Sequence, residues 1–351
     1  MERLGRLREA MVADGIAALL VTDRVNVRWL TGFAGSAGTV HVMADGPAVL
    51  VTDDRYAERA AEDAPGWTIV SDRTWGWLAE HHPAGVPLTV EADHLTWSVV
   101  RQLEDLDADR PLHPSTGIVG TLREIKDDAE IAILRRACAI TSTAFDEALG
   151  WLAPGLTEAE VARRLLETMA DLGADGSAFD PIVASGPNGS RPHHAPGPRT
   201  LRTGDLVTMD FGALVDGYHA DMTRTVALGR PTPSLRRVHD LVGAAQQAGV
   251  EAVADGVGTQ AVDAACRDLI RDAGHGEHFA HGTGHGVGLA IHETPFLGPS
   301  TPGTLRARTT VTVEPGVYVP GLGGVRIEDV VLVGADGAER LTTAPRQLIE
   351  L

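Results

Sequence analysis

The sequence MDFGALVDGYHADMTRT, from Met209 to Thr225, decides the fold of the surrounding chain, because it predicts a β-hairpin. Two runs rich in β-forming residues flank the dipeptide Asp216-Gly217, which suits a two-residue type I′ turn. The hairpin carries several polar residues, so the register of its two strands determines which of them lie close together.

With Val215 paired to Tyr218 across the turn, Asp210 faces Thr223 and lies diagonally opposite Asp221. The two aspartates then share one face of the hairpin, about 7–8 Å apart. Two carboxylates at that spacing can converge on metal ions between them. Taken alone, the same pair is equally compatible with a solvated face, so other parts of the chain have to decide.

Further candidates for metal ligands follow downstream. Residues 281–288, HGTGHGVG, contain His281 and His285, while Glu314 and Glu328 lie in two β-rich runs. With the hairpin, these residues supply four carboxylates and one ligand imidazole. Such a donor set suits a pair of hard or borderline divalent ions. The sequence therefore indicates a metal site around the hairpin.

The histidine segment has two other interpretations. His281 and His285 have the spacing of a helical zinc pair, but the glycines between them disfavour a helix. Residues 284–288 also resemble a dinucleotide-binding loop, but they lack its glycine spacing and its βαβ frame. We therefore expect a strand, whose alternation places His281, Thr283 and His285 on one face.

The composition restricts the classes of function. The 351 residues, 43% hydrophobic and 22% charged, are enough for two globular domains. The formal net charge of −18 argues against nucleic acid or an anionic membrane as a partner, and no apolar run approaches the ~20 residues of a membrane helix. Cys138 and Cys266 form no disulfide framework, and the N-terminus has no signal-peptide core. We expect a cytoplasmic protein with two core thiols.

The first part of the chain alternates predicted strands and helices, which predicts a mixed sheet covered by helices. Residues 111–117, PLHPSTG, interrupt this pattern, and a charged helix over residues 126–139 begins a new one. We place the domain boundary near residue 120, giving domains 1–120 and 121–351. The predicted strands lie near residues 17–21, 38–43, 48–52, 68–70 and 88–91, and the predicted helices near 4–12, 55–63, 75–80 and 97–106.

Two loops carry adjacent histidines. His81 and His82 precede a proline and have no carboxylate at ligand spacing, so we expect both on the surface. Residues 187–197, PNGSRPHHAPG, are too rich in proline and glycine to be helical, and this loop could aim a histidine at the hairpin. Upstream of it, Thr157 and Glu160 have the spacing of a capping box at a helix start.

With Asp210, Asp221, His285, Glu314 and Glu328 in this order, the chain resembles the pita-bread metallopeptidases. This family comprises methionine aminopeptidase, aminopeptidase P and prolidase, with creatinase as a metal-free relative. The resemblance covers residues 121–351 and implies an α+β protein of two domains, an N-terminal creatinase/aminopeptidase P-like α/β domain and a C-terminal pita-bread fold. It rests on DFG at 210–212, DMTRT at 221–225, HGTGHGVG at 281–288, IHE at 291–293, EPGVY at 314–318 and RIED at 326–329, and more weakly on WLTGF at 29–33 and TDDRY at 52–56 in the first domain.

The resemblance implies two divalent metal ions. Asp210 would bind one ion, and Asp221 and Glu328 would bridge both. His285 and Glu314 would complete the other. Two ions about 3.5–4 Å apart can lower the pKa of a shared water and stabilise the oxyanion that forms as hydroxide attacks a peptide carbonyl. Manganese is our first expectation because oxygen ligands dominate, with cobalt and zinc as alternatives.

The resemblance also implies a catalytic shell around the ions. Its members are His193, His281, His292 and Arg326, together with Glu314, which acts as a ligand as well. His194 lies beside His193 in a loop that departs somewhat from the family pattern, so either histidine could occupy the shell position.

The choice among activities rests on the domain content and on the metal set. A first domain as large as residues 1–120 argues against methionine aminopeptidase, and the filled ligand positions argue against creatinase-like chemistry. We expect an Xaa-Pro aminopeptidase of the aminopeptidase P type, a homodimer acting on peptides with proline at the second position, because of the first-domain resemblance. Prolidase is the alternative within the family. A catalytically silent pita-bread binding protein is the alternative from another class.

Overall fold

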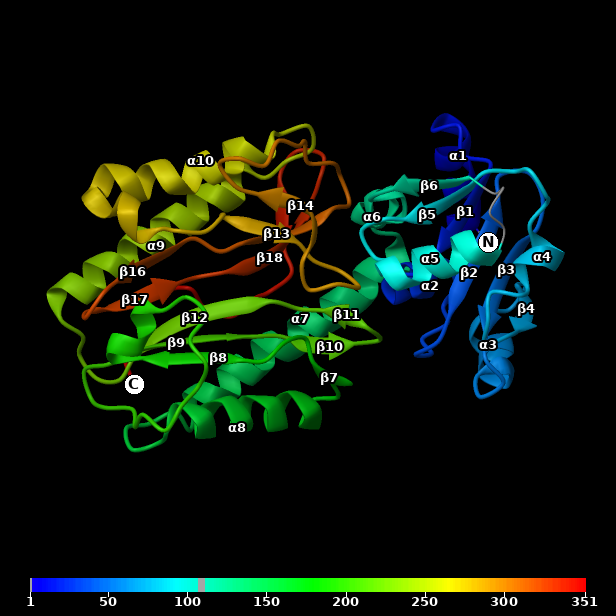
Figure 1. Ribbon diagram of the computed structural model, residues 1–351. Helices are drawn as coiled ribbons and strands as arrows, with labels where there is room; N and C mark the ends of the chain where they lie inside the picture. The colour runs from blue at the N-terminus through cyan, green and yellow to red at the C-terminus, as the bar shows by residue number, and fades with distance from the viewer. Residues whose placement is uncertain (1, 107–110) are drawn as a thin grey trace. The chain divides into compact units, whose positions relative to one another are not determined.

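The computed structural model describes residues 2–106 and 111–351, and the chain forms two compact units, Met1–Arg123 and Glu124–Leu351 (Figure 1). Both units have buried apolar clusters among their described residues. Within the described residues, every helix is too short or too polar to span a lipid bilayer.

The first unit is built on a mixed sheet, as the alternation of strands and helices predicts. Its described strands are β1(Ala18–Val21), β2(Thr39–Met43), β3(Ala48–Thr52), β4(Thr68–Ser71), β5(Leu88–Glu91) and β6(Leu112–Ser115), and its described helices are α1(Glu2–Ala13), α2(Arg24–Thr31), α3(Ala57–Asp63), α4(Leu78–His81), α5(Trp97–Leu106) and α6(Ile118–Glu124). The strand order is β4-β3-β2-β1-β5-β6. β2 runs antiparallel to both neighbours, whereas the other pairs are parallel.

Two sequence expectations fail in this unit. Residues 111–117 do not interrupt the sheet, because β6 pairs with β5; as an edge strand it tolerates Pro114. His82 is buried rather than on the surface. Its Nδ1 lies 3.1 Å from Nε2 of His41, and its Nε2 lies 2.9 Å from the carbonyl oxygen of Val86. This burial depends on a histidine from β2, a contact that local sequence spacing cannot reveal.

The second unit is described throughout, and its strands form four sheets. Its helices are α7(Asp128–Leu149), α8(Glu158–Asp171), η1(Gly186–Ser190), α9(Pro233–Ala252), α10(Thr259–Ile270), η2(Arg271–His275) and η3(Gly276–His278). Its strands are β7(Gly176–Ser177), β8(Ile182–Ser185), β9(Leu206–Phe211), β10(Ala213–Val215), β11(Tyr218–His219), β12(Met222–Ala227), β13(Gly284–Gly286), β14(Glu293–Leu297), β15(Thr310–Val313), β16(Gly316–Val319), β17(Gly323–Arg326), β18(Asp329–Val333) and β19(Ala338–Arg340). The sheets are β11-β10-β7, β12-β9-β8, β14-β13-β15-β18-β19 and β16-β17.

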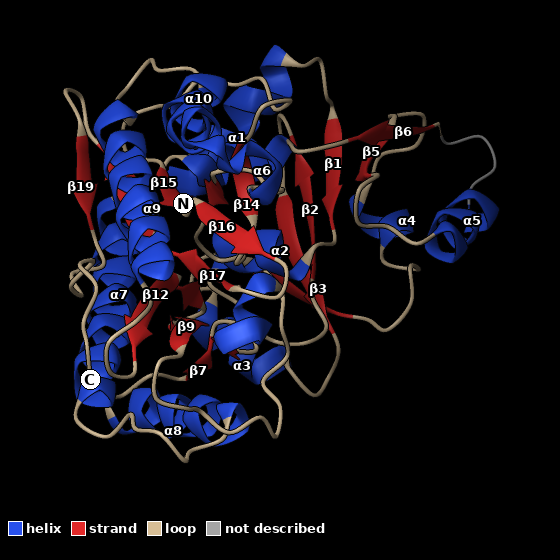
Figure 2. Cartoon of the chain, turned by 90° about the vertical axis from the view of Figure 1, so that its left-hand side faces the viewer, coloured by secondary structure: helices blue, strands red, loops and turns tan. Residues whose placement is uncertain are grey.

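Two helix pairs enclose these strands. α7 and α8 lie along one side, packed on β10 and β8, and α9 and α10 lie along the other, packed on β17 and β14 (Figure 1). Figure 2 shows the same four helices at the periphery of the unit, with β9, β12 and β17 inside. Side chains on the inner strands are therefore shielded from solvent by helices on both sides.

The hairpin has the predicted register. Val215 pairs with Tyr218, and Asp210 pairs with Thr223. Both turn residues, 216 and 217, have positive φ values, 46° and 75°, as a type I′ turn requires. The turn and the alternating pattern thus bring the two aspartates to the same side.

The hairpin is not one continuous ladder, because it is divided at Gly212. β9 and β12 form a sheet with β8, whereas β10 and β11 form a separate sheet in which β10 pairs with β7. A Cβ on Gly212 would lie 1.8 Å from the carbonyl oxygen of Ala220, so only glycine fits at this close approach of the two strands. The division releases Asp221 from the ladder immediately before β12.

Two predictions about helices are confirmed. The Thr157 hydroxyl accepts the backbone N–H of Glu160, and the Glu160 carboxylate accepts the backbone N–H of Thr157, which closes the capping box at the start of α8. Cys138 on α7 and Cys266 on α10 are both free and buried.

Candidate metal centre

A cavity of about 490 Å³ opens among the inner strands of the second unit. All nine residues that the sequence singles out as ligands or catalytic residues line it: His193, Asp210, Asp221, His281, His285, His292, Glu314, Arg326 and Glu328. They come from segments up to 135 positions apart in the chain, between His193 and Glu328. The fold therefore collects the predicted polar set in one place.

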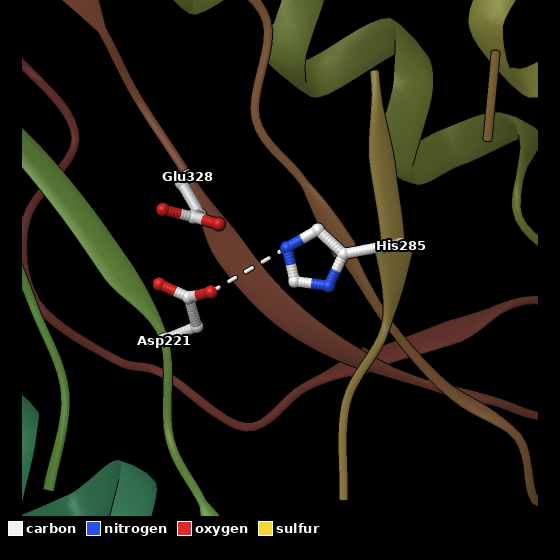
Figure 3. A group of neighbouring side chains, drawn as sticks. All are labelled: Asp221, His285 and Glu328. Atoms are coloured by element: carbon white, nitrogen blue, oxygen red, sulfur yellow. Dashed lines mark ion pairs between the residues drawn. The ribbon is translucent and has the colours of Figure 1, made fainter. Parts of the chain in front are cut away.

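Three of these side chains converge at the centre of the cavity. Asp221, His285 and Glu328 each offer a ligand atom within 4.8 Å of the others. Figure 3 shows the two carboxylates pointing at the imidazole, with His285 Nε2 3.6 Å from Asp221 Oδ2. Asp221 precedes β12, Glu328 precedes β18, and His285 lies on β13, so three different strands set this geometry.

Glu314 and Asp210 extend the group in two directions. Glu314 follows β15, and its Oε1 lies 3.4 Å from His285 Nε2. Asp210, on β9, accepts a hydrogen bond at Oδ2 from the Arg326 guanidinium at 2.6 Å. Its other oxygen, Oδ1, is buried and has no hydrogen-bond partner within the described residues. A buried acceptor without a donor is costly, so this oxygen is suited to a cation.

The electrostatics of the cluster are unbalanced. Burial, with the charges of Glu328, Asp210 and Glu314, raises the pKa of Asp221 well above its usual range. Burial also raises the pKa of Glu328 well above its usual range and that of Glu314 to about 8, although Arg326 opposes the latter shift. Among the described residues that line the cavity, Arg326 is the one permanently charged cation beside four carboxylates. The raised pKa values mean that the fully ionised cluster is unfavourable, and a cation bound among the carboxylates would offset this repulsion.

Arg326 is held by a residue that the sequence left without a role. The Tyr318 hydroxyl lies 2.8 Å from Arg326 Nη1 and 2.8 Å from His281 Nε2. Burial raises the pKa of Tyr318 to about 12 and lowers the pKa of His281 to about 4, so both side chains are neutral near pH 7. Tyr318 belongs to the EPGVY motif at residues 314–318. The motif alone did not indicate that its hydroxyl contacts Arg326 and His281.

Thr223 is the second residue that sequence reasoning missed. Its buried hydroxyl donates to Glu328 Oε2 at 2.7 Å and accepts from Arg326 Nε at 3.0 Å. Its backbone carbonyl also accepts the N–H of Glu328 at 3.1 Å. The hairpin register gave the signal, because it places Thr223 opposite Asp210 on the face that carries the carboxylates.

The histidine segment differs from the predicted strand. Only Gly284–Gly286 is β-strand, so His281 lies before the strand rather than on a shared face with His285. Thr283 donates its hydroxyl to Asp263 of α10 at 2.9 Å instead of facing the cavity. A Cβ on Gly284 would lie 2.0 Å from the carbonyl oxygen of Thr312. Close backbone packing against β15, rather than simple alternation, therefore sets the path of this segment.

The two adjacent loop histidines point to different partners. His193 is exposed and lines the cavity, whereas His194 is mostly buried with Nε2 2.8 Å from Glu158 Oε2. His292 precedes β14, and its ring meets the ring of His285 edge to face at a centroid distance of 4.4 Å. His193 and His292 are thus the two imidazoles that reach the cavity from exposed segments.

Comparison with known proteins identifies the family. The profile of metallopeptidase family M24 matches residues 132–335, and that of the creatinase/prolidase N-terminal domain matches residues 3–125. The chain belongs to metallopeptidase family M24. Its two-unit α+β architecture is the one expected from the resemblance, with a creatinase-type first domain and a pita-bread second domain.

Relatives of this M24 chain match over almost their full length. The solved structure of an Xaa-Pro dipeptidase from Bacillus anthracis is 40% identical, with a TM-score of 0.96 and coverage of 100% of this chain and 99% of that chain. An Xaa-Pro dipeptidase from Pyrococcus furiosus is 33% identical over 99% of both proteins. An X-Pro aminopeptidase from Thermotoga maritima is 32% identical, with a TM-score of 0.91 and 99% coverage of both chains. These comparisons favour the dipeptidase alternative over the aminopeptidase P assignment that the first domain suggested.

The residues of this M24 chain fit a divalent metal centre. Three buried carboxylates, the partly buried Glu314 and one imidazole are donors that hard and borderline ions prefer. Burial lowers the pKa of His285 to about 4, so the ring is neutral at neutral pH, and its Nδ1–H donates to the Gly286 carbonyl oxygen at 3.0 Å, which leaves the Nε2 lone pair free. Within the described residues Asp210 Oδ1 has no hydrogen-bond donor, and the clustered carboxylates repel one another, so both features favour cations inside the cavity.

Proposed function

We propose that the protein is a metal-dependent Xaa-Pro dipeptidase. The observation that supports this most strongly is the convergence of four carboxylates and an imidazole in the wall of one cavity, in a chain whose relatives include named Xaa-Pro dipeptidases. A cavity of about 490 Å³ is also within the range of small-ligand sites. The proposed reaction is hydrolysis of the amide bond between an amino acid and a following proline.

Five residues would hold two divalent ions. The His285 contacts favour a set in which Glu314 and His285 serve one ion and Asp210 the other. Asp221 and Glu328, whose ligand atoms lie within 4.8 Å of each other and of one on His285, would bridge the two ions. When bound, the ions would supply a water of lowered pKa and Lewis acidity toward the peptide carbonyl. Manganese is the proposed ion because oxygen donors dominate, with cobalt and zinc as alternatives.

The chain's own residues would orient the substrate and move protons. His292 lies against His285 and would donate an imidazole N–H to the carbonyl oxygen as that oxygen gains negative charge. His193 would give a proton to the departing proline nitrogen, which must be protonated to leave. Arg326 is fixed by Asp210 and Tyr318 and would keep the carboxylate cluster in place.

Proline gives such a site its selectivity. Its ring removes the amide hydrogen and fixes φ, so the scissile bond is a tertiary amide of restricted shape. Apolar side chains from Phe179, Ile182, Ile291 and Phe296 line the cavity beside the polar cluster and offer a surface for the ring. We therefore expect dipeptides without proline to be poor substrates.

An Xaa-Pro aminopeptidase is the second candidate, supported by the similarity to the Thermotoga maritima enzyme. The assignments to a homodimer and to the cytoplasm remain predictions.

A substrate panel tests the proposal. After reconstitution with manganese, cobalt or zinc, the protein is offered Ala-Pro, Ala-Pro-Ala and Ala-Ala, and release of free amino acid is measured. We expect metal-dependent hydrolysis of Ala-Pro above both other peptides. Preference for Ala-Pro-Ala would support the aminopeptidase, and metal binding without hydrolysis of any peptide would identify a silent binding protein.

A further inference from the structure

Glu158 is a fully buried carboxylate outside the cavity wall. It lies in the first turn of α8, where Thr157 and Glu160 already form the capping box. Glu158 is therefore not needed to cap the helix. A buried carboxylate requires compensation by hydrogen bonds or charge, so its donors indicate what it does.

Within the described residues, the hydrogen-bond donors to the Glu158 carboxylate all come from one segment, residues 185–197. Oε1 accepts the Ser185 N–H at 2.8 Å, the Ser185 hydroxyl at 2.7 Å and the Asn188 amide at 3.0 Å. Oε2 pairs with His194 Nε2 at 2.8 Å and accepts the Gly197 N–H at 3.3 Å. One carboxylate thus holds both ends and the middle of the loop that follows β8.

Burial acts to raise the pKa of Glu158, but the hydrogen bonds from Ser185, Asn188 and His194 outweigh it and lower the pKa below its usual range. The carboxylate is therefore ionised at neutral pH. Hydrogen bonds to an ionised acceptor are shorter and stronger than neutral ones, which makes the anchor firm.

The opposite side of the same loop contacts the cavity. The Pro192 carbonyl accepts Arg326 Nη1 at 3.3 Å, and a Cβ on Gly189 would lie 2.9 Å from the backbone nitrogen of Gly324 on β17. Residues 191–197 are neither helix nor strand, so these side-chain contacts define their path. His194 turns back to Glu158, and His193 is left on the cavity side.

We propose that Glu158 is a positioning residue for the peptidase reaction, which fixes the 185–197 loop through Ser185, Asn188 and His194 so that His193 faces the substrate. The adjacent histidines then have separate roles. His194 holds the loop by its hydrogen bond to Glu158, and His193 faces the substrate in the cavity. The proposal rests on the proposed function for its activity readout and on the loop geometry for its structural readout.

The test compares Glu158→Gln with the matched control Glu160→Gln in the metal-loaded protein. Glutamine preserves a capping box, so the control should keep wild-type kcat/KM. We expect Glu158→Gln to lower kcat/KM for Ala-Pro by about 10–100-fold, because misplacing a catalytic group by about 1 Å can cost about 10²-fold, with unchanged metal content.

Double-mutant analysis separates positioning from general damage. If Glu158 acts through His193, adding Glu158→Gln to His193→Ala should change kcat/KM by less than about twofold, because the step it supports is already lost. If the losses in kcat/KM of the two single variants multiply in the double variant, the proposal is wrong. It is also wrong if the Glu158→Gln variant is as active as wild type.

Hydrogen exchange gives a readout that does not depend on activity. Peptides covering residues 185–197 should exchange faster in Glu158→Gln than in Glu160→Gln, with the rest of the chain unchanged. Unchanged exchange in this segment would overturn the anchor. If Glu158→Gln does not fold, Asn188→Ala leaves the buried carboxylate intact and should produce the same local effect in smaller degree. If the wild-type protein cleaves no Xaa-Pro peptide, the proposed function fails, and the exchange result alone decides the anchoring.

Discussion

Replacing Thr223 by valine should weaken metal binding without unfolding the protein. Valine has nearly the same shape as threonine, so the buried position stays filled, but the hydroxyl is lost. That hydroxyl donates to Glu328 Oε2 at 2.7 Å and accepts from Arg326 Nε at 3.0 Å. Without it, the carboxylate of Glu328, a proposed bridging ligand, loses the hydrogen bond that orients it.

The magnitude follows from these contacts. A hydrogen bond to a charged group contributes about 1.5–3 kcal/mol, and Thr223 makes one to a carboxylate and one to a guanidinium. Loss of an outer hydrogen bond to a metal ligand typically weakens metal affinity about 10–100-fold, equivalent to about 1.4–2.8 kcal/mol. We therefore expect the metal Kd to rise by about that factor, with a stability loss of about 1–3 kcal/mol in the metal-free protein.

The assay is competition for manganese between the protein and a chromogenic chelator, with Thr223→Ser as the matched control. Serine retains the hydroxyl and loses one methyl group, so its metal Kd should stay close to wild type. Denaturant unfolding of the metal-free forms measures the stability difference separately. An unchanged Kd in Thr223→Val, or an equal loss in Thr223→Ser, would refute the reasoning that the hydroxyl orients Glu328.

Three further predictions concern the ligands, the oxyanion and the thiols. Asp221→Ala or Glu328→Ala should lose both ions and all measurable activity, and elemental analysis that finds two retained metals in either variant would rule out bridging. His292→Ala should keep its metal but lose about 10²–10³ in kcat, the cost of one oxyanion donor, and an unchanged kcat would remove His292 from catalysis. Burial raises the pKa of Cys138 well above its usual range and that of Cys266 to about 12, so a thiol reagent at pH 8 should label neither in the folded protein and both after denaturation; rapid labelling of the folded protein would contradict this.

The hairpin shows how far local rules extend. The Asp216-Gly217 turn and the period of two residues were enough to predict the pairing of Val215 with Tyr218 and of Asp210 with Thr223. Both rules act between residues close in sequence. The division at Gly212 was not predictable in this way, because it depends on which neighbouring strands, β7 and β8, pair with each half.

Most of the remaining site residues were predicted from the sequence motifs and not from the geometry of the expected strands. The family resemblance carried by the acidic and histidine motifs selected nine residues that line one cavity. The partners that hold them were not predicted, because Tyr318 with His281 and Glu158 with His194 are contacts between segments 37 and 36 residues apart. The prediction that the HGTGH segment is a strand with His281, Thr283 and His285 on one face was also wrong. Packing of Gly284 on β15 sets the path of this segment instead of strand alternation.

The choice between dipeptidase and aminopeptidase shows a different limit. The motifs around Asp221 and Glu328 are expected in both kinds of enzyme, so they do not separate the two activities. The first-domain resemblance favoured the aminopeptidase, whereas comparison over the full chain favours the dipeptidase. The distinction depends on which group the cavity accepts after proline. In a dipeptide this group is a free carboxylate, and in a longer peptide it is a further residue.

The dipeptidase assignment is therefore tested most sharply by the ratio of kcat/KM for Ala-Pro to that for Ala-Pro-Ala, measured with the manganese-loaded protein. We predict a ratio of at least about ten in favour of the dipeptide, equivalent to about 1.4 kcal/mol of transition-state stabilisation. A ratio of one or below would contradict the dipeptidase assignment and favour the aminopeptidase.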